Sequence, residues 1–188
     1  MSVGRLATRV LIGGLFIGHG GQKLFGWFGG PGRAGTEGMM ESLEMRPAKV
    51  HALAAGVSET AGGALLLTGL ATPLAAATLT GVMTTAIRKV HAPNGPWATN
   101  GGWEYNAVLI AAVTSLAETG PGAFSLDRHF GIERTGNRWA LAALLGGVAT
   151  AFATMAAGAR GPAAPAAAAV APTPAEESVA GDPTTEGA

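Results

Sequence analysis

The chain has 188 residues, of which 48% are hydrophobic and 13% are charged. Charged residues make up about 25% of an ordinary soluble domain, so this composition is typical of a protein that contacts lipid. The formal net charge is zero and the longest basic run is the Arg88-Lys89 pair, which makes nucleic acid an unexpected partner. Because cysteine is absent, disulfides, thiolate catalysis and cysteine-bound metal centres are excluded.

Five apolar segments are suited to crossing a hydrocarbon core of about 30 Å, which takes about 20 helical residues. They are predicted at residues 5–25, 48–69, 73–91, 103–118 and 138–159. Pro47 and Pro73 stand where the second and third segments begin, and proline is tolerated in the first turn of a helix. The sequence therefore predicts an all-α fold: a transmembrane antiparallel four-helix bundle followed by a fifth, C-terminal transmembrane helix.

Two further segments differ in composition from these helices. Residues 34–45 mix Met, Leu and Glu at helical spacing, which predicts either a short amphipathic helix on the membrane surface or a loop. Residues 161–188 are mostly Ala, Pro, Thr and acidic residues, and we expect a disordered tail there. The predicted organisation is a membrane core over residues 1–136, an additional transmembrane helix over 137–160 and a tail over 161–188.

Polar side chains collect at one end of the predicted bundle. Up-and-down threading places the end of the first helix, the start of the second, the end of the third and the start of the fourth on the same side. His19, Gln22 and Lys23 are spaced i, i+3 and i+4, so a helix puts them on one face. The predicted binding pocket on this side is lined by Gln22, Lys23, Arg88, His91, Glu104, Tyr105 and Asn106. Arg88 taken alone is more simply explained as an interfacial side chain.

Glu59 is the most informative of the polar residues. It lies about 18 Å along its helix from Pro47, close to the middle of a bilayer. An ionisable side chain there costs roughly 3 kcal/mol or more, so Glu59 is expected to face the bundle interior and to pair with His19 or Lys23. Glu59 and His19 are the candidate catalytic groups, on the interpretation that they carry a proton. No metal site is predicted, because the histidines stand at different depths, which argues against bis-histidine haem.

Gly14 and Gly18 form a GxxxG pair in the first apolar segment. Such a pair permits close packing of two helices, either inside the bundle or between two copies of the chain. A homo-oligomer is therefore a possible assembly.

Four motifs, in order, resemble those of the DoxX family and together span about residues 5–131. The first is Gly18-His19-Gly20-Gly21-Gln22-Lys23-Leu24-Phe25-Gly26. The others are Glu59 with Gly62-Gly63 and Leu66-Leu67-Thr68-Gly69, then Gly101-Gly102-Trp103-Glu104-Tyr105-Asn106, then Gly120-Pro121-Gly122 with Ser125-Leu126-Asp127. The resemblance implies a four-helix membrane core in a multi-pass protein of the cell membrane.

The DoxX family takes its name from a subunit of an archaeal thiosulfate:quinone oxidoreductase, and some bacterial relatives are linked to thiosulfate handling and oxidative stress. The resemblance therefore implies a membrane component near quinone- or sulfur-linked redox chemistry. Quinone is the cofactor to consider, and membrane or soluble redox proteins are the expected partners beside the lipid bilayer. Two alternatives stay open: a noncatalytic scaffold for soluble redox enzymes, and a small-solute or proton transporter. Whether the chain is itself an enzyme is also open.

Overall fold

The structure is a computed structural model that describes residues 3–161, and within that range every regular element is a helix. The predicted all-α class is thus confirmed. The tail predicted from residue 161 onward lies, apart from Gly161, outside the described residues.

Five long helices coincide with the predicted apolar segments. They are α1 (Val3–Phe25), α3 (Ala48–Thr68), α4 (Thr72–Ala86), α5 (Glu104–Thr119) and α7 (Asn137–Arg160). A π-helical turn, Ile87–His91, continues α4 to the predicted end of its segment. By length and composition, α3 and α7 are apolar enough to cross a membrane.

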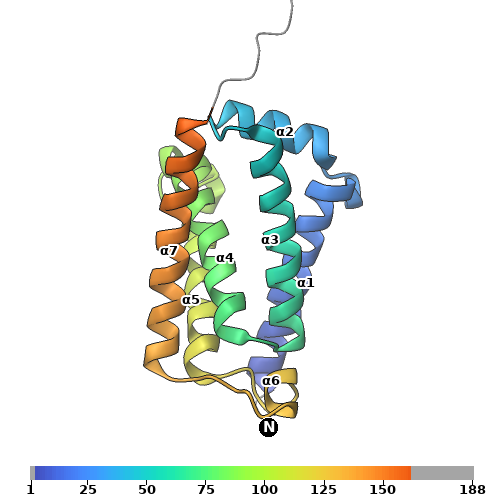
Figure 1. Cartoon of the computed structure of the whole chain (residues 1–188), viewed down its shortest axis with the longest axis vertical. Helices are drawn as coiled ribbons and strands as arrows, with labels where there is room; N and C mark the ends of the chain where they lie inside the picture. Colours follow the sequence, from blue (N-terminus) through green and yellow to red (C-terminus); the bar gives the residue numbers. More distant parts are fainter. Residues whose placement is uncertain (1–2, 162–188) are drawn as a thin grey trace, which may run out of the picture.

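The long helices run antiparallel to their chain neighbours and form two groups (Figure 1). Helix α1 packs along α3, while α4, α5 and α7 pack on one another, and α3 joins the groups through α4. A buried apolar core follows these contacts, with Phe16, Leu66, Leu79, Val113 and Ala143 among its members. Helix α7 therefore belongs to the packed body of the bundle, where Gly147 lies directly against the backbone of α4 at Ala77.

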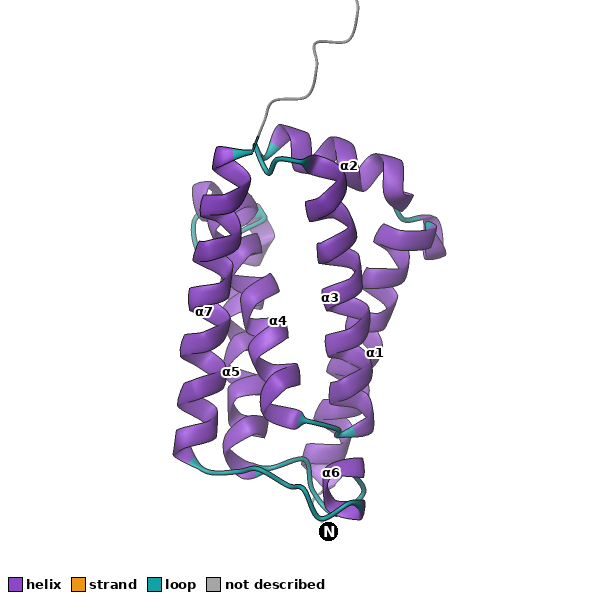
Figure 2. Ribbon diagram, viewed as in Figure 1, coloured by secondary structure: helices purple, strands orange, loops and turns teal. Residues whose placement is uncertain are grey.

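Short elements close both ends of the bundle (Figure 2). Helix α2 (Gly32–Ser42) lies across one end, where it packs on α1 and α3. The segment predicted as an amphipathic helix or a loop is thus largely helical. Helix α6 (Leu126–His129) and the loops around it lie at the opposite end, beside the start of α1.

Glycines set the distance between α1 and α3. A Cβ atom added to Gly63 would stand 2.7 Å from the carbonyl oxygen of Gly13, so the two backbones are in direct contact. The GxxxG glycines do not make this contact: Gly14 has no neighbour within 4 Å of such an atom, and Gly18 has only the Phe28 ring at 3.9 Å. The close packing anticipated for the GxxxG pair is therefore made by glycines on a neighbouring face of α1.

A buried arginine ties the start of α1 to two other parts of the chain. Arg9 is 2% exposed, and its guanidinium donates to four backbone carbonyls. Two of them, Leu66 and Leu67 at 2.9 and 2.7 Å, end α3, and two, Pro121 and Phe124 at 2.8 Å each, belong to the loop after α5. The last carbonyls of a helix lack intrahelical partners, and Arg9 supplies one to Leu67 while it shares the Leu66 carbonyl with the N–H of Gly69.

Asp127 has the matching role at the start of α4. Its carboxylate accepts from the backbone N–H of Ala71 at 2.7 Å and from the N–H and hydroxyl of Thr72 at 3.0 and 2.8 Å. The N–H of Asp127 in turn donates to the carbonyl of Gly69 at 2.9 Å. An acceptor from α6 thus caps the N-terminus of α4, where free N–H groups and the helix dipole favour negative charge.

The glycine contact predicts opposite effects for two substitutions on the α1–α3 pair. Gly63→Ala should lower the free energy of unfolding by about 1–3 kcal/mol, because the added methyl group meets backbone atoms that cannot rotate away. Gly14→Ala is the control and should leave stability unchanged or raise it by up to about 1 kcal/mol, since alanine favours a helix and the site is open. Thermal unfolding in detergent, followed by circular dichroism, measures both. Equal effects would show that the α1–α3 contact is not as close as described.

The cap on α4 gives a second prediction. Asp127→Asn should lower the free energy of unfolding by about 2 kcal/mol, because an amide NH₂ would replace an oxygen that accepts backbone hydrogen bonds. Glu118→Gln, an exposed change at the same end of the bundle, should alter it by less than about 0.5 kcal/mol. The same unfolding measurement compares the two variants. Stability of Asp127→Asn equal to that of Glu118→Gln would contradict the capping role.

Candidate functional site

An ion pair joins α1 to the middle of α3. The Lys23 Nζ atom lies 2.7 Å from Oε2 of Glu59, and the side chains are 19% and 6% exposed. Glu59 is the twelfth residue of α3, which has 21 residues, so the carboxylate stands near the centre of the helix. The predicted contact between Glu59 and a donor from the first helix is confirmed, and the donor is Lys23.

The pair forms because small residues precede both partners by three positions. Gly20 lies three residues before Lys23, and Gly56 lies three residues before Glu59. A Cβ atom on Gly20 would stand 2.7 Å from the carbonyl oxygen of Gly56, so the helices touch one turn away from the ion pair. This close approach brings the lysine ammonium within reach of the carboxylate.

His19 and Gln22 stand beside the ion pair on α1. The Nδ1 atom of His19 lies 3.1 Å from Oε1 of Gln22, at an exposed position. His19 is close enough to act electrostatically on the Glu59 carboxylate, although the two groups are not hydrogen-bonded to each other. The structure thus brings four of the predicted site residues together: His19, Gln22, Lys23 and Glu59.

Helix α2 covers the ion pair from the end of the bundle. Thr36, which is 1% exposed, donates from its hydroxyl to the carbonyl of Gly32 at 2.7 Å and stands 3.4 Å from the carbonyl of Lys23. Lys89, from the π-helical turn, donates to the carbonyl of Leu43 at 2.9 Å just after α2. Because α2 is fixed at both places, it limits the access of water to Lys23 from that end.

The remaining predicted pocket residues do not reach the Lys23–Glu59 pair. His91 and Glu104 order the loop over residues 92–103: His91 Nδ1 lies 2.7 Å from the Gly101 carbonyl, and the Glu104 carboxylate accepts from the Ala98 N–H at 2.7 Å. Asn106 is buried, and its amide nitrogen lies 3.3 Å from the Met83 sulfur. The last two predicted residues, Arg88 and Tyr105, are exposed.

This arrangement does not fit a quinone head group beside Glu59. A quinone needs donors aimed at its two carbonyl oxygens within an apolar slot. Lys23 Nζ is instead paired with Oε2 of Glu59, and the side chains expected to complete the slot are used in a loop, buried elsewhere or exposed. In the part of the chain that the structure describes, no group of three His, Asp or Glu side chains could hold a metal ion.

Sequence reasoning missed the second buried polar centre, formed by Arg9 and Asp127 at the opposite end. Asp127 was named only within the last of the four family motifs, and no role was predicted for Arg9, which precedes the apolar run of the first helix. The available signal was Arg9 itself, since an arginine inside a helix that crosses a membrane has to find acceptors within the protein. Here it finds them in four backbone carbonyls.

Comparison with known proteins identifies the family. A model of the DoxX family matches residues 4–92, the segment from the first turn of α1 past the π-helical turn. No curated protein and no solved structure matches the chain. The matched segment contains Lys23 and Glu59 and the first two of the four motifs from which the resemblance was inferred, whereas the other two motifs lie beyond residue 92. Residues 4–92 thus form a DoxX-family segment, which supports membership of this chain in the DoxX family.

Proposed function

We propose that this chain is a multi-pass protein of the cell membrane, in which the Lys23–Glu59 pair carries a proton for quinone- or sulfur-linked redox chemistry performed with partner proteins. The observation that supports the proposal is the buried pair itself, at 2.7 Å between the last turn of α1 and the middle of α3. Any electron-carrying group belongs to the partners, since the residues around the pair are not arranged to hold one.

The directions of the charged side chains support a multi-pass arrangement. Helix α1 has 23 residues and would measure about 34 Å, long enough for a bilayer, yet it contains three cations inside or near its apolar run. Arg9 is buried against carbonyls and Lys23 is paired with Glu59, so neither one needs to face lipid. A helix that appears too polar by composition is thus compatible with a membrane when its charges point inward.

Exposed apolar side chains support the same placement. Aliphatic residues are exposed along the lengths of the helices, among them Leu15, Val57, Val108 and Leu145. Exposed aromatic residues concentrate near the helix ends, where interfacial aromatic belts occur: Trp27, Phe28, Trp97, Trp103 and Tyr105 at one end, and Phe124 and Phe130 at the other.

A lysine–glutamate pair in a medium of low dielectric constant is suited to holding a proton. Removing a proton from Lys23, or adding one to Glu59, leaves a single uncompensated charge, so the protonation of each residue depends strongly on the other. His19 stands beside the pair at an exposed position, and an imidazole ring can both donate and accept a proton. These groups supply proton transfer and need no further cofactor on this chain.

A scaffold role is the second candidate, and the loop over residues 92–103 favours it. This loop is held in shape by His91 and Glu104 and exposes 63% of Trp97. A rigid exposed loop with an aromatic side chain is the kind of feature to which a soluble redox enzyme could dock. Under this hypothesis the activity-sensitive residues would lie in the loop, and the Lys23–Glu59 pair would be structural.

Replacement of Glu59 distinguishes the two functions. Glu59→Gln keeps an oxygen that accepts from Lys23 but removes the titratable group, so the protein should reach the membrane in normal amount. Growth under oxidative or thiosulfate stress should then fall to that of cells lacking the gene. Glu41→Gln, an exposed change in α2, is the matched control and should grow like wild type. Growth and membrane abundance are measured together.

The double variant Lys23→Met/Glu59→Leu tests whether the pair matters for more than packing. Apolar residues of similar size often replace a buried ion pair without loss of stability, so this variant should assemble but fail under stress. Normal growth of both Glu59→Gln and the double variant, at normal abundance, would reject the proton-carrying role. If changes at Trp97 then abolished growth, the scaffold function would replace it.

A further inference from the structure

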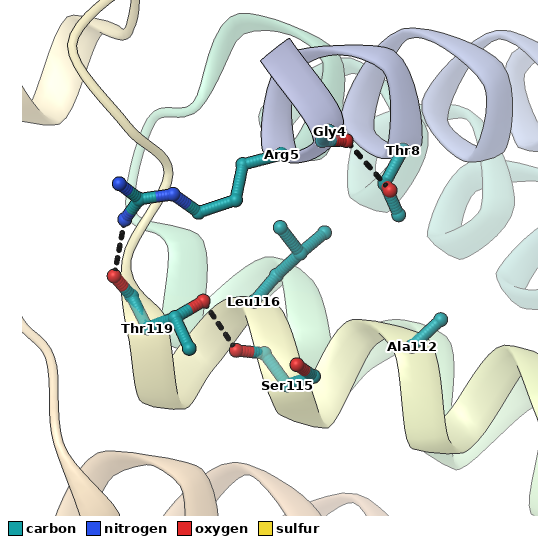
Figure 3. Close-up of a pocket in the computed structure, with 7 residues that line it drawn as sticks. All are labelled: Gly4, Arg5, Thr8, Ala112, Ser115, Leu116 and Thr119. Carbon is teal, nitrogen blue, oxygen red and sulfur yellow. Dashed lines mark hydrogen bonds between the residues drawn. The ribbon is translucent and has the colours of Figure 1, made fainter. Parts of the chain in front are cut away.

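A cavity opens between the first turn of α1 and the last turn of α5, at the opposite end of the bundle from the Lys23–Glu59 pair (Figure 3). Its volume is about 640 Å³, and it is lined by both polar and apolar side chains. Arg5 is the one charged residue among its lining residues, which otherwise include Thr8, Ala112, Ser115 and Thr119. Neither the proton-carrying proposal nor the scaffold alternative uses this cavity.

The Arg5 side chain is held at the mouth of the cavity. Its Nη1 atom donates to the carbonyl of Thr119 and lies 3.4 Å from the carbonyl of Gly120 (Figure 3). Among the described residues no acceptor pairs with the other guanidinium nitrogens, so they are free to bind an anion. The guanidinium matches a phosphate in geometry and charge, and it is already oriented by the hydrogen bond to Thr119.

The cavity runs from the membrane surface toward the membrane interior. Arg5 and Thr119 stand at helix ends, where lipid head groups lie, whereas Ala112 is seven residues before Thr119 and therefore about 10 Å deeper. The apolar track continues on the same faces through Leu15 on α1, which is 44% exposed, and Val108 on α5, which is 62% exposed. A charged mouth followed by an apolar track fits a molecule with an anionic head and a hydrocarbon chain.

We propose that this cavity binds one anionic phospholipid, with its phosphate on Arg5 and an acyl chain along Ala112 and Val108. Basic sites between helix ends are a recognised place for lipid head groups. Apart from the buried Arg9 and Asp127, the charges at this end also favour an anion, since Arg128, Arg134 and Arg138 outnumber Glu118 and the half-buried Glu133. The inference rests on the membrane placement proposed above but not on the chemistry of Glu59.

Binding is tested with the full chain in nanodiscs that contain phosphatidylcholine and a small fraction of phosphatidylglycerol, with the retained lipid measured by native mass spectrometry. Arg5→Gln should lower retention of phosphatidylglycerol about tenfold, because one charge-assisted phosphate contact is lost. Ser115→Leu should lower it similarly by filling the cavity without a change in charge. Arg138→Gln is the matched control: it removes an arginine that does not line the cavity and should change retention by less than about twofold.

Several results would overturn the proposal. Equal losses for Arg5→Gln and Arg138→Gln would indicate general attraction to a negative surface. If phosphatidylcholine were retained as well as phosphatidylglycerol, the cavity would not require an anionic lipid. Displacement of the lipid by millimolar inorganic phosphate would indicate a site for a small anion. If Arg5→Gln unfolded the protein, Ser115→Leu would still decide, since it retains Arg5. Failure of the chain to enter nanodiscs would reject the membrane placement itself, whereas normal insertion with unchanged lipid retention would reject the lipid site alone.

Discussion

The close approach of α1 and α3 is the constraint on which both polar centres depend. Gly13 meets Gly63 and Gly20 meets Gly56, so the two backbones touch at two places about two turns apart. This spacing lets one end of α1 deliver Arg9 to the last carbonyls of α3 and the other end deliver Lys23 to Glu59. Side chains larger than hydrogen at these glycines would separate the helices and leave buried charges without partners, at a cost of several kcal/mol.

The two polar centres differ in how completely they are satisfied. Arg9 makes four hydrogen bonds with its five N–H donors and Asp127 accepts three, so each side chain is held by several contacts. Glu59 has a single hydrogen bond, from Lys23, and its second carboxylate oxygen has no partner among the described residues. A change in the protonation of Glu59 therefore disturbs only one hydrogen bond. For this reason the proposal assigns proton transfer to Glu59 and a structural role to Arg9 and Asp127.

The sequence was sufficient to predict the features that follow from long apolar segments and from the free-energy cost of burying an unpaired charge. The helical segments followed from their length, and the contact of Glu59 with Lys23 followed from the cost of an unpaired carboxylate at that depth. The sequence was less informative about which glycines of α1 meet α3. Gly13 and Gly14 differ by about 100° around the helix axis, and the contact within the chain is made by Gly13 rather than by the GxxxG pair. Local sequence patterns also do not specify which helices pack against each other. Arg88 and Tyr105 were therefore predicted to share a pocket with Glu59 only because they lie at the same end of the bundle.

On the proposed membrane placement, insertion of α1 is coupled to that of α3 by the same contacts. In isolation α1 would expose Arg9 and Lys23 near or within hydrocarbon, at roughly 3 kcal/mol for each charge near the helix centre, and α3 would expose Glu59 at a similar cost. Together they present glycine and apolar side chains to each other and turn these three charges inward. The α1–α3 pair is therefore the smallest part of the chain that lipid can accommodate without unpaired charge at Lys23 and Glu59. Arg9 additionally needs the loop after α5, since two of its carbonyl acceptors come from that loop.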